Sequence, residues 1–381
     1  MIIAGEASGD LHGANLARDL KMLGNGFKLS GIGGAGMAEA GVRLFYDISN
    51  LAVMGIIEVL SRLKDIRSAM NILEKQFRTA PPDLLILIDY PGFNLELARR
   101  AKKYNIPVLY YISPKIWAWR EGRIKRIKKY VDRMAVILPF EKKFYKGHGV
   151  DVDFVGNPLL GQVHATLTQA EFRARNNIDF DATVIGIMPG SRRQEIAKLL
   201  PLFLQAAEKL NSTIERCVFL LPIASTLTEN EIKEHGGGHG RLLDIRIIKD
   251  GHYEAMAACN AAIAASGTLT MELAILRVPM VVCYRISIIS ALLVKPFIKV
   301  KYASLVNLVA EKEVVPELLQ REATPEKIYE KILPLLLKKE ARETMQKELT
   351  MVCDKLGGPG ASSRTAKLAI EMLAAGIESR G

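Results

Sequence analysis

The stretch Ile3–Leu20, IAGEASGDLHGANLARDL, combines the end of a buried strand, a glycine-containing turn and the start of a helix. A strand that leads into a helix in this way is the building unit of a parallel α/β sheet, and such turns often hold a phosphate at the helix N-terminus. Here the turn carries Glu6 and Asp10, whose negative charges oppose a diphosphate. The stretch therefore predicts an α/β fold and a ligand other than a phosphate at this turn.

Short apolar runs alternate with helical patterns along almost the whole chain, which is typical of parallel α/β proteins. The Gly/Pro-containing connector Val155–Gln162 separates two series of such runs, and we interpret it as a hinge. Two α/β domains of similar size that face a cleft are therefore expected. The predicted strands are Met1–Ala4, Lys28–Ile32, Leu84–Asp89, Val108–Ile112 and Met134–Leu138, and then Thr183–Met188, Val218–Pro222, Ile245–Ile248, Ala261–Ala265 and Met280–Tyr284.

The composition is that of a globular chain with a marked basic excess. Of its 381 residues 49% are hydrophobic, and the net charge of +11 favours anionic partners such as nucleic acid, anionic lipid or phosphorylated small molecules. The four cysteines are scattered without CxxC spacing, which fits a reducing compartment. No apolar run reaches the ~18 residues of a membrane span, and no N-terminal signal is visible. Because few residues precede the first turn, we expect the natural start to lie upstream of Met1.

Two short motifs are better explained by ordinary turns or loops than by a cofactor or metal site. GIGGAG, Gly31–Gly36, matches GxGxxG but follows the second predicted strand and not the first, so we expect a tight turn beside a ligand rather than a nicotinamide site. HGGGH, His235–His239, has the spacing of two helical metal ligands, but three glycines disfavour that helix. A surface loop is expected there, and no metal site is predicted.

The segment Trp117–Arg133 is strongly basic. It holds six basic residues between Arg120 and Lys129, and Ile124, Ile127 and Val131 form one apolar stripe of a helix. A solvated basic face and contact with anionic lipid both fit this pattern. Nucleic acid is less well supported, because no aromatic residues are interleaved along the helix.

One acidic side chain stands where an α/β sheet binds its ligands. The apolar run in DLLILIDYPGFN, Asp83–Asn94, ends at Asp89 before a Pro-Gly turn. Ligands bind at the carboxyl ends of parallel strands, and an apolar strand behind a carboxylate raises its pKa. Asp89 is therefore a candidate general base, and a helix N-cap is the alternative.

The second half of the chain offers two anion-friendly helix starts. In VIGIMPGSRRQEI, Val184–Ile196, Ser191 and Gln194 have the spacing of a capping box, and the adjacent Arg192 could bind a diphosphate. In AIAASGTLTMELAI, Ala262–Ile275, the turn Ser266, Gly267, Thr268 opens a helix that carries Glu272, whose carboxylate can accept both hydroxyls of a ribose. This half is predicted to bind a nucleoside diphosphate.

These motifs occur together, and in the same order, in one known family. The chain resembles the lipid-A-disaccharide synthases, and the segments that carry the resemblance are GEASGDLHGANL, IDYPGFN, YYISPKIWAWR, LPFEKKFY, VGNPL, PGSRRQEI, ASGTLTMELA, VPMVVCYR and YASLVNLVA. The resemblance implies an inverting glycosyltransferase of the GT-B architecture with two Rossmann-like domains. It implies transfer of 2,3-diacylglucosamine from its UDP conjugate to the 6-hydroxyl of 2,3-diacylglucosamine 1-phosphate, in the cytoplasm at the inner membrane, without a cofactor or catalytic metal.

The resemblance also assigns domains and residues. Residues 1–157 would form the acceptor domain and 158–345 the nucleotide-sugar domain, while 346–381 would return to the first domain. Asp89 would be the catalytic base, and the acceptor side would be lined by Glu6, Ser8 and Asp10. The nucleotide sugar would be held by Ser191, Arg192, Ser266, Gly267, Thr268, Glu272 and Asn307.

The acyl chains of such substrates require apolar and basic surface. We expect it from the apolar stretches Leu51–Leu63 and Ile286–Leu305 and from the basic segment, with membrane or acyl contacts by Arg120, Arg123, Arg126, Lys129, Ile289, Leu292 and Leu293. The chain would then be a peripheral protein of an anionic membrane surface, either monomeric or homodimeric, and would not bind nucleic acid.

Two rival functions stay open. A UDP-sugar 2-epimerase or another GT-B transferase would share the fold and the nucleotide half, but it would need neither the WAWR segment nor acylated substrates. A non-catalytic lipid-binding protein would not need an acid at the end of a strand.

Overall fold

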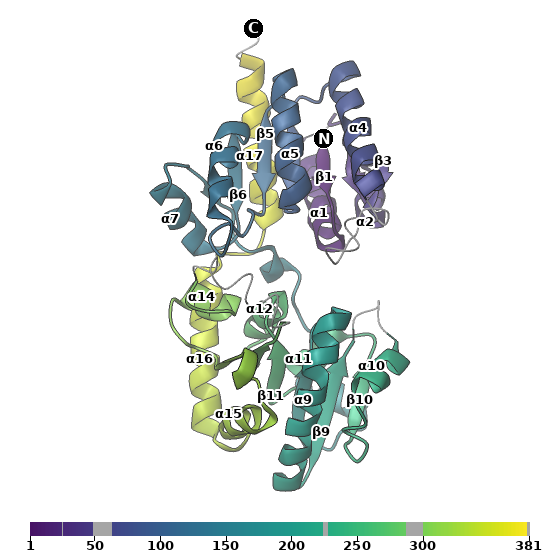
Figure 1. Ribbon diagram of the computed structural model, residues 1–381, viewed down its shortest axis with the longest axis vertical. Coiled ribbons are helices and arrows are strands. Elements are labelled where there is room, and N and C mark those ends of the chain that lie inside the picture. The colour runs from purple at the N-terminus through teal and green to yellow at the C-terminus, as the bar shows by residue number, and fades with distance from the viewer. Residues whose placement is uncertain (25, 49–62, 224–227, 287–299, 379–381) are drawn as a thin grey trace. The chain divides into compact units, whose positions relative to one another are not determined.

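The computed structural model describes residues 1–24, 26–48, 63–223, 228–286 and 300–378 (Figure 1). They form two compact units. One comprises Met1–Pro158 together with Gly357–Gly381, and the other Leu159–Leu356. The expected boundaries at 157 and 345 differ from this division at the second position, because the helix α16 (Lys339–Lys355) runs unbroken through residue 345.

The first unit contains a seven-stranded sheet in the order β3-β2-β1-β4-β5-β6-β7, with neighbouring strands parallel. The order reverses between β1 and β4, so this is a doubly wound sheet with its topological switch point there. Its strands are β1 (Ile2–Ala4), β2 (Ser30–Gly33), β3 (Arg43–Asp47), β4 (Leu85–Ile88), β5 (Val108–Tyr111), β6 (Arg133–Val136) and β7 (Asp153–Phe154). Its helices are α1 (Ala7–Leu23), α2 (Ala35–Glu39), α4 (Leu63–Thr79), α5 (Pro91–Ala101), α6 (Ile124–Tyr130), α7 (Pro139–Gly147) and α17 (Ala361–Glu378), with short 3₁₀ turns at Lys102–Tyr104 and Glu121–Arg123.

Alternate residues of β4 face the two sides of this sheet, and both sides are buried. Leu85 and Leu87 pack into the core beneath α4 and α5, whereas Ile86 and Ile88 pack into the core on the side of α1 and α17. A strand covered on both faces reads as a continuous apolar run, which is why LLILI was recognisable in the sequence.

The C-terminal helix α17 belongs to the first unit, where it packs beside α1. Arg364 at its start donates to the carbonyl oxygen of Val155 at 2.8 Å, and Glu371 lies 2.7 Å from Arg133 of β6. The chain therefore leaves the first unit after Pro158 and returns to it at Gly357.

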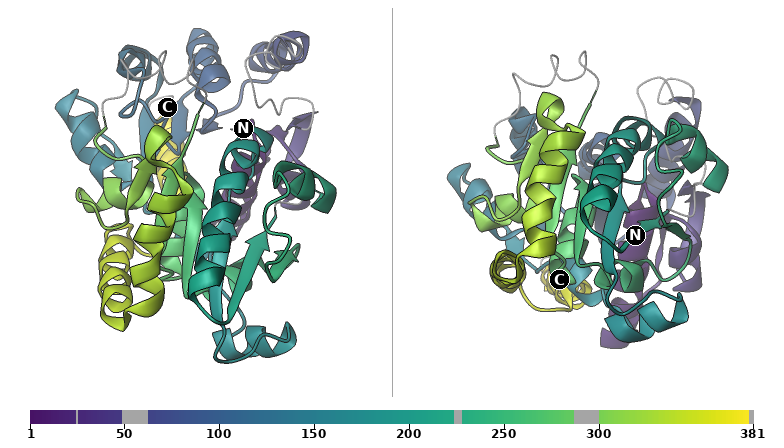
Figure 2. Two further views of the ribbon diagram at one scale, coloured as in Figure 1. Left: turned by 60° about the horizontal axis from the view of Figure 1, so that its bottom comes forward. Right: turned by 90° about the horizontal axis from the view of Figure 1, so that it is seen from below.

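The second unit contains a six-stranded parallel sheet in the order β10-β9-β8-β11-β12-β13, with the switch point between β8 and β11. In Figure 2, α9 and α15 lie side by side, and both pack against β11. Its strands are β8 (Thr183–Met188), β9 (Cys217–Pro222), β10 (Ile245–Ile248), β11 (Ala261–Ala265), β12 (Met280–Tyr284) and β13 (Glu317–Leu319). Its helices are α8 (Gln169–Arg175), α9 (Arg193–Thr213), α10 (Glu229–His235), α11 (His252–Ala257), α12 (Thr268–Ile275), α14 (Leu305–Ala310), α15 (Pro325–Leu337) and α16, with a 3₁₀ turn at Gln320–Glu322. A further 3₁₀ turn, Pro158–Gly161, begins at the last residue of the first unit's main segment.

Each unit is thus a Rossmann-like domain, and the predicted fold class is confirmed. Among the described residues, no helix is both long and apolar enough to cross a membrane.

Candidate active site

Asp89 lies at the carboxyl end of β4, at the switch point of the first sheet, in a turn with unusual backbone geometry. Asp89 and Tyr90 have φ angles of 43° and 44°, in the left-handed region that side chains other than glycine rarely adopt. The turn is held by three hydrogen bonds to backbone carbonyl oxygens. The Asn94 amide donates to the carbonyl oxygens of Ile88 and Asp89 at 3.0 and 2.7 Å, and the Tyr110 hydroxyl donates to that of Asp89 at 2.5 Å. Strain of this kind persists where the surrounding structure fixes a side chain for a task.

The surroundings of Asp89 suit a general base. Burial raises the pKa of its carboxyl to about 6, the negative charge of Glu6 adds to this rise, and the positive charge of Lys115 opposes it. Asp89 is therefore ionised at neutral pH, yet it is a stronger base than an exposed aspartate. A carboxylate of this strength can accept a proton from a hydroxyl that is attacking an electrophile.

The first turn, after β1, adjoins Asp89. Glu6 is the exposed N-cap residue of α1, and its side chain makes no capping hydrogen bond, while Ser8 is also exposed. A Cβ atom on Gly5 would lie only 2.3 Å from the Tyr90 ring, so this turn and the Asp89 turn fit together only because residue 5 is glycine. Of the predicted acceptor-side residues, Glu6 and Ser8 lie at the carboxyl edge of the sheet, and Glu6 is close enough for its charge to act on Asp89.

Asp10 has a different, structural role that the sequence did not indicate. Its carboxylate accepts the backbone N–H groups of Gly34, Gly36 and Met37 at 2.6, 2.9 and 3.1 Å. It thereby caps α2 and fixes the GIGGAG turn. Each oxygen of Asp10 thus has a backbone partner, and a contact with a sugar stays a prediction for Asp10 as it does for Glu6 and Ser8.

The loop after β5 is anchored by a carboxylate that sequence reasoning missed. Glu141 of α7 is 1% exposed and accepts hydrogen bonds from the Ser113 hydroxyl at 2.6 Å and from Nε1 of Trp117 at 3.0 Å. It also accepts the backbone N–H groups of Ile137 and Leu138 at 3.2 and 2.9 Å. These hydrogen bonds hold the WAWR segment, which begins at Trp117, against α7. The only signal in the sequence was a glutamate in the run LPFE.

The predicted basic contacts divide into two kinds. Arg120 lies over the Trp119 ring at 4.2 Å and Lys129 over the Tyr130 ring at 5.6 Å, and Arg120, Trp119 and Lys129 are exposed. Arg123 is half-buried near the Tyr110 hydroxyl, and burial lowers the pKa of its guanidinium. The predicted apolar contacts Ile289, Leu292 and Leu293 lie outside the described residues, as does most of the stretch from 51 to 63.

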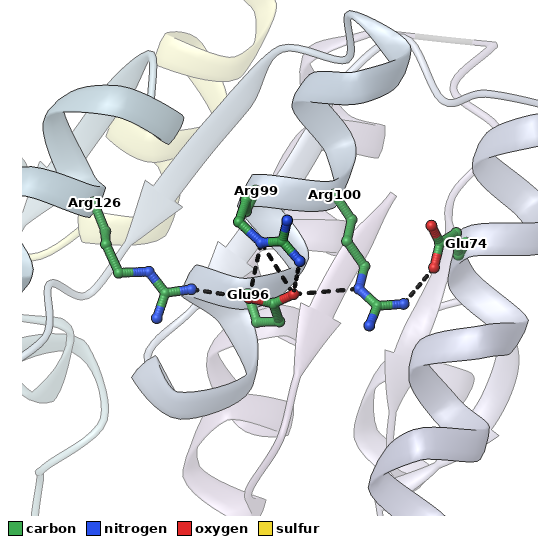
Figure 3. Close-up of polar contacts among 5 residues, drawn as sticks. All are labelled: Glu74, Glu96, Arg99, Arg100 and Arg126. Atoms are coloured by element: carbon green, nitrogen blue, oxygen red, sulfur yellow. Dashed lines mark hydrogen bonds and ion pairs between the residues drawn. The ribbon is translucent and has the colours of Figure 1, made fainter.

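Arg126, also predicted as a headgroup contact, is part of an ion-pair network within the first unit (Figure 3). It lies 3.1 Å from a carboxylate oxygen of Glu96, which also pairs with Arg99 and Arg100 on its own helix. Arg100 reaches on to Glu74 of α4. The network joins α4, α5 and α6, so the charge of Arg126 is already partly neutralised.

In the second unit, the turn after β8 differs from the predicted capping box. The N-cap residue of α9 is Arg192 and not Ser191, and its side chain makes no capping hydrogen bond. Arg192 is exposed and lies 3.0 Å from Glu195, one turn further along α9. An exposed pair of this kind is weak, so the guanidinium is available to an anion at the N-terminus of this long helix.

The turn after β11 lies next to Arg192, because β8 and β11 are neighbours at the switch point of this sheet. Gly267 and Thr268 are exposed at the start of α12, and Ser266 is half-buried. Burial raises the pKa of Glu272, and the nearby His252 partly offsets this rise. The structure thus brings together the predicted diphosphate residue and the predicted ribose residue at one edge of one sheet.

Asn307 does not match its predicted role as a ligand contact. It is 0% exposed, and its amide group is fully bonded within the chain: it donates to Val315 and Glu317 and accepts from the N–H groups of Val314 and Val315. The prediction is corrected to a structural role, because no polar atom of this amide is left for a nucleotide.

Comparisons with known proteins give one consistent result. A family model described as lipid-A-disaccharide synthetase matches residues 1–372. The lipid-A-disaccharide synthase of Syntrophus aciditrophicus is 46% identical over 98% of this chain and 97% of that protein. The enzyme of that name from Nitrosococcus oceani is 45% identical over 98% of this chain and 95% of that protein.

Similar solved structures show the same architecture at low identity. The UDP-GlcNAc 2-epimerase of Neisseria meningitidis, solved with UDP-GlcNAc, has a TM-score of 0.66 at 13% identity and covers 98% of each chain. The glycosyltransferase of kitacinnamycin has a TM-score of 0.65 at 15% identity and covers 97% of each chain. At these identities the likeness establishes the fold and leaves the reaction to the site residues.

Proposed function

The chain belongs to the lipid-A-disaccharide synthase family, as the resemblance predicted, and on that premise we propose the reaction and the part that each residue plays in it. The enzyme is a glycosyltransferase of lipid A biosynthesis. It transfers 2,3-diacylglucosamine from its UDP conjugate to 2,3-diacylglucosamine 1-phosphate. The observation that carries the mechanism is Asp89, a partly buried carboxylate fixed at the switch point of the first sheet.

The chemical step is a direct displacement at the anomeric carbon. The carboxylate of Asp89 takes the proton of the acceptor 6-hydroxyl as its oxygen bonds to that carbon. The bond from the carbon to the diphosphate breaks on the opposite side, so the anomeric configuration is inverted and UDP leaves with the electron pair. Arg192 and the N-termini of α9 and α12 stabilise the negative charge that develops on the diphosphate. The residues assigned to these tasks require no cofactor or metal ion.

Mass spectrometry of a detergent reaction tests this function. The protein is incubated with UDP-2,3-diacylglucosamine and 2,3-diacylglucosamine 1-phosphate, with and without EDTA. We expect a disaccharide monophosphate and UDP in equal amounts, unchanged by EDTA. UDP release without disaccharide would favour the epimerase or another transferase. A reaction abolished by EDTA and restored by a divalent metal would overturn the metal independence.

Substitution of Arg192 tests the diphosphate contact. We expect Arg192→Ala to weaken UDP binding about tenfold or more, because a charge-assisted hydrogen bond to a phosphate is lost. Isothermal titration with UDP measures this effect. The matched control is Arg193→Ala, which removes the neighbouring guanidinium that lies 2.7 Å from Glu231. Equal losses in the two variants, or unchanged binding in Arg192→Ala, would remove Arg192 from the site.

We also propose that the enzyme works at an anionic membrane surface, through exposed cations stacked on aromatic rings. Arg120 on Trp119 and Lys129 on Tyr130 are pairs of the type that suits the boundary between headgroups and acyl chains. The double variant Arg120→Ala, Lys129→Ala should bind vesicles containing anionic lipid about 30-fold more weakly, as expected for two lost surface cations. Vesicle sedimentation at low and high salt measures this.

The control for the membrane experiment changes the net charge equally. Lys312→Ala, Lys339→Ala removes two exposed lysines from the second unit, which pair with Glu348 and Glu343. It should sediment with vesicles as the wild type does. Binding that ignores salt and anionic lipid content would contradict the electrostatic part of the proposal.

A further inference from the structure

Glu317 is a polar centre of the second unit that no step of the mechanism uses. It lies in the edge strand β13, directly beside β12. Its Oε1 accepts the backbone N–H of Ser304 at 2.9 Å, the Ser304 hydroxyl at 2.8 Å and the Asn307 amide at 2.8 Å. Its Oε2 accepts the backbone N–H of Ala303 at 2.7 Å. One carboxylate therefore fixes two consecutive backbone groups and two side chains.

Asn307 belongs to the same group of hydrogen-bonded residues as Glu317 and connects it to Val314 and Val315. Its amide also donates to the carbonyl oxygen of Val315 at 2.8 Å, and its oxygen accepts the N–H of Val314 at 2.7 Å. Ser304 and Asn307 are both 0% exposed. These side chains hold the loop that contains Ala303 in one position, and neither of them can reach a ligand directly.

One hydrogen bond joins the loop that contains Ala303 to the turn Ser266–Thr268, which is predicted to bind the nucleotide. The Ser266 hydroxyl donates to the carbonyl oxygen of Ala303 at 2.9 Å, and the Ser266 backbone N–H donates to Cys283 of β12, also at 2.9 Å. A hydroxyl has a single proton, so Oγ of Ser266 has only lone pairs left to offer. Lone pairs repel the oxygens of a diphosphate, but they can accept a hydrogen bond from a ribose hydroxyl or a base N–H.

We propose that Glu317 is a positioning residue of the nucleotide site, acting through Ala303 on Ser266, and that Ser266 accepts a hydrogen bond from the nucleoside part of the ligand. This inference rests on the proposed use of a UDP-sugar. It separates the roles within the turn: Gly267, Thr268 and Arg192 serve the diphosphate, while Ser266 and Glu272 serve the nucleoside.

The first experiment measures UDP binding by titration calorimetry in Glu317→Gln and Ser266→Ala. We expect each variant to bind UDP about three- to tenfold more weakly, the range for one hydrogen bond lost or misplaced. The KM for the UDP-sugar should rise accordingly, while the KM for the acceptor stays unchanged. The matched control is Glu322→Gln, an exposed carboxyl nearby that pairs with Lys327 at 3.1 Å. Wild-type affinity in Glu317→Gln would overturn the proposal.

The second experiment asks whether Glu317 acts through Ser266. If it does, the double variant should bind UDP no more weakly than Glu317→Gln alone, because residues in one network are not additive. Effects that simply multiply would show that Glu317 acts elsewhere. If Glu317→Gln does not fold, Ser304→Ala replaces it in this double-mutant comparison. Ser304→Ala removes one of the four hydrogen bonds that Glu317 accepts and leaves the carboxylate in place.

The third experiment identifies which part of the ligand Ser266 contacts. Ser266→Ala should weaken UDP and uridine equally, as measured by competition, and leave the affinity for inorganic pyrophosphate unchanged. A loss of pyrophosphate affinity as large as that for UDP would place Ser266 on the diphosphate and overturn the inference. These readouts need only UDP binding, so a wild type that binds UDP without forming a disaccharide would refute the proposed reaction alone.

Discussion

Asp89→Asn is expected to lower kcat by about 10²–10⁴-fold, the usual contribution of a general base. An amide cannot take the proton of the acceptor hydroxyl, yet it matches the carboxylate in size. Asparagine also tolerates the left-handed backbone that Asp89 adopts at a φ of 43°, so the turn itself should survive. Initial rates of disaccharide formation at saturating substrates measure the loss, and UDP binding should stay at the wild-type level.

The pH profile gives this experiment an independent readout. The Asp89 carboxyl, whose pKa is raised to about 6, must be ionised to act, so kcat/KM of the wild type should fall as the pH drops through about 6. Asp89→Asn should lack this acid limb. The control Asp151→Asn changes an exposed aspartate between α7 and β7 and should keep both rate and profile. Near-normal turnover in Asp89→Asn would exclude Asp89 as the base.

The sequence predicted all the inner strands of both sheets and one edge strand, β10 (Ile245–Ile248), but it missed the other three edge strands. The run Leu85–Ile88 is buried on both faces and therefore apolar throughout, which makes it visible. In contrast, β3 (Arg43–Asp47) has exposed and half-buried residues, and β7 and β13 have only two and three residues. Edge strands are short and partly solvated, so they carry no continuous apolar signal. All three missed strands lie at the ends of their sheets.

The site was predictable where position along a strand decides the chemistry. Asp89 was identified because it follows an apolar run, and the structure places it at a switch point. Asp10 and Asn307 were assigned to ligands because both are polar and occur in motifs of the family. The Asp10 carboxylate accepts backbone N–H groups from a distant segment that only the fold brings near, whereas the Asn307 oxygen accepts those of Val314 and Val315 in the turn that follows its own helix. Neither arrangement leaves a pattern of side chains in the sequence.

The prediction that Ser191 caps the helix was wrong for a related reason. The spacing of Ser191 and Gln194 fits a capping box, but the chain stays extended through Arg192, at φ −97° and ψ 133°, and the helix begins one residue later. The acidic residue that falls in its first turn is then Glu195, which pairs with Arg192. A motif of two residues cannot fix a boundary to within one position.

Glu141→Ala is expected to destabilise the first unit by about 3–5 kcal/mol, because it leaves four donors without their shared acceptor in a site closed to solvent. For a unit of this size the loss corresponds to a fall in Tm of about 10 °C. The chain has two tryptophans, Trp117 and Trp119, and both lie in the loop that Glu141 anchors. Denaturation followed by tryptophan fluorescence therefore reports on this loop directly.

A single-donor variant separates loss of the shared acceptor from loss of one hydrogen bond. Ser113→Ala removes one hydrogen bond and keeps the carboxylate, so it should cost only about 1 kcal/mol, whereas Trp117→Phe also loses buried indole volume and should cost more. Glu39→Ala, at an exposed position in α2, should leave the transition unchanged. If Glu141→Ala unfolded like Ser113→Ala, the four hydrogen bonds would contribute little, and the buried carboxylate would need another explanation. If it unfolds as expected, the fixed position of the loop beside Asp89 depends on a residue outside every motif to which a catalytic role was assigned.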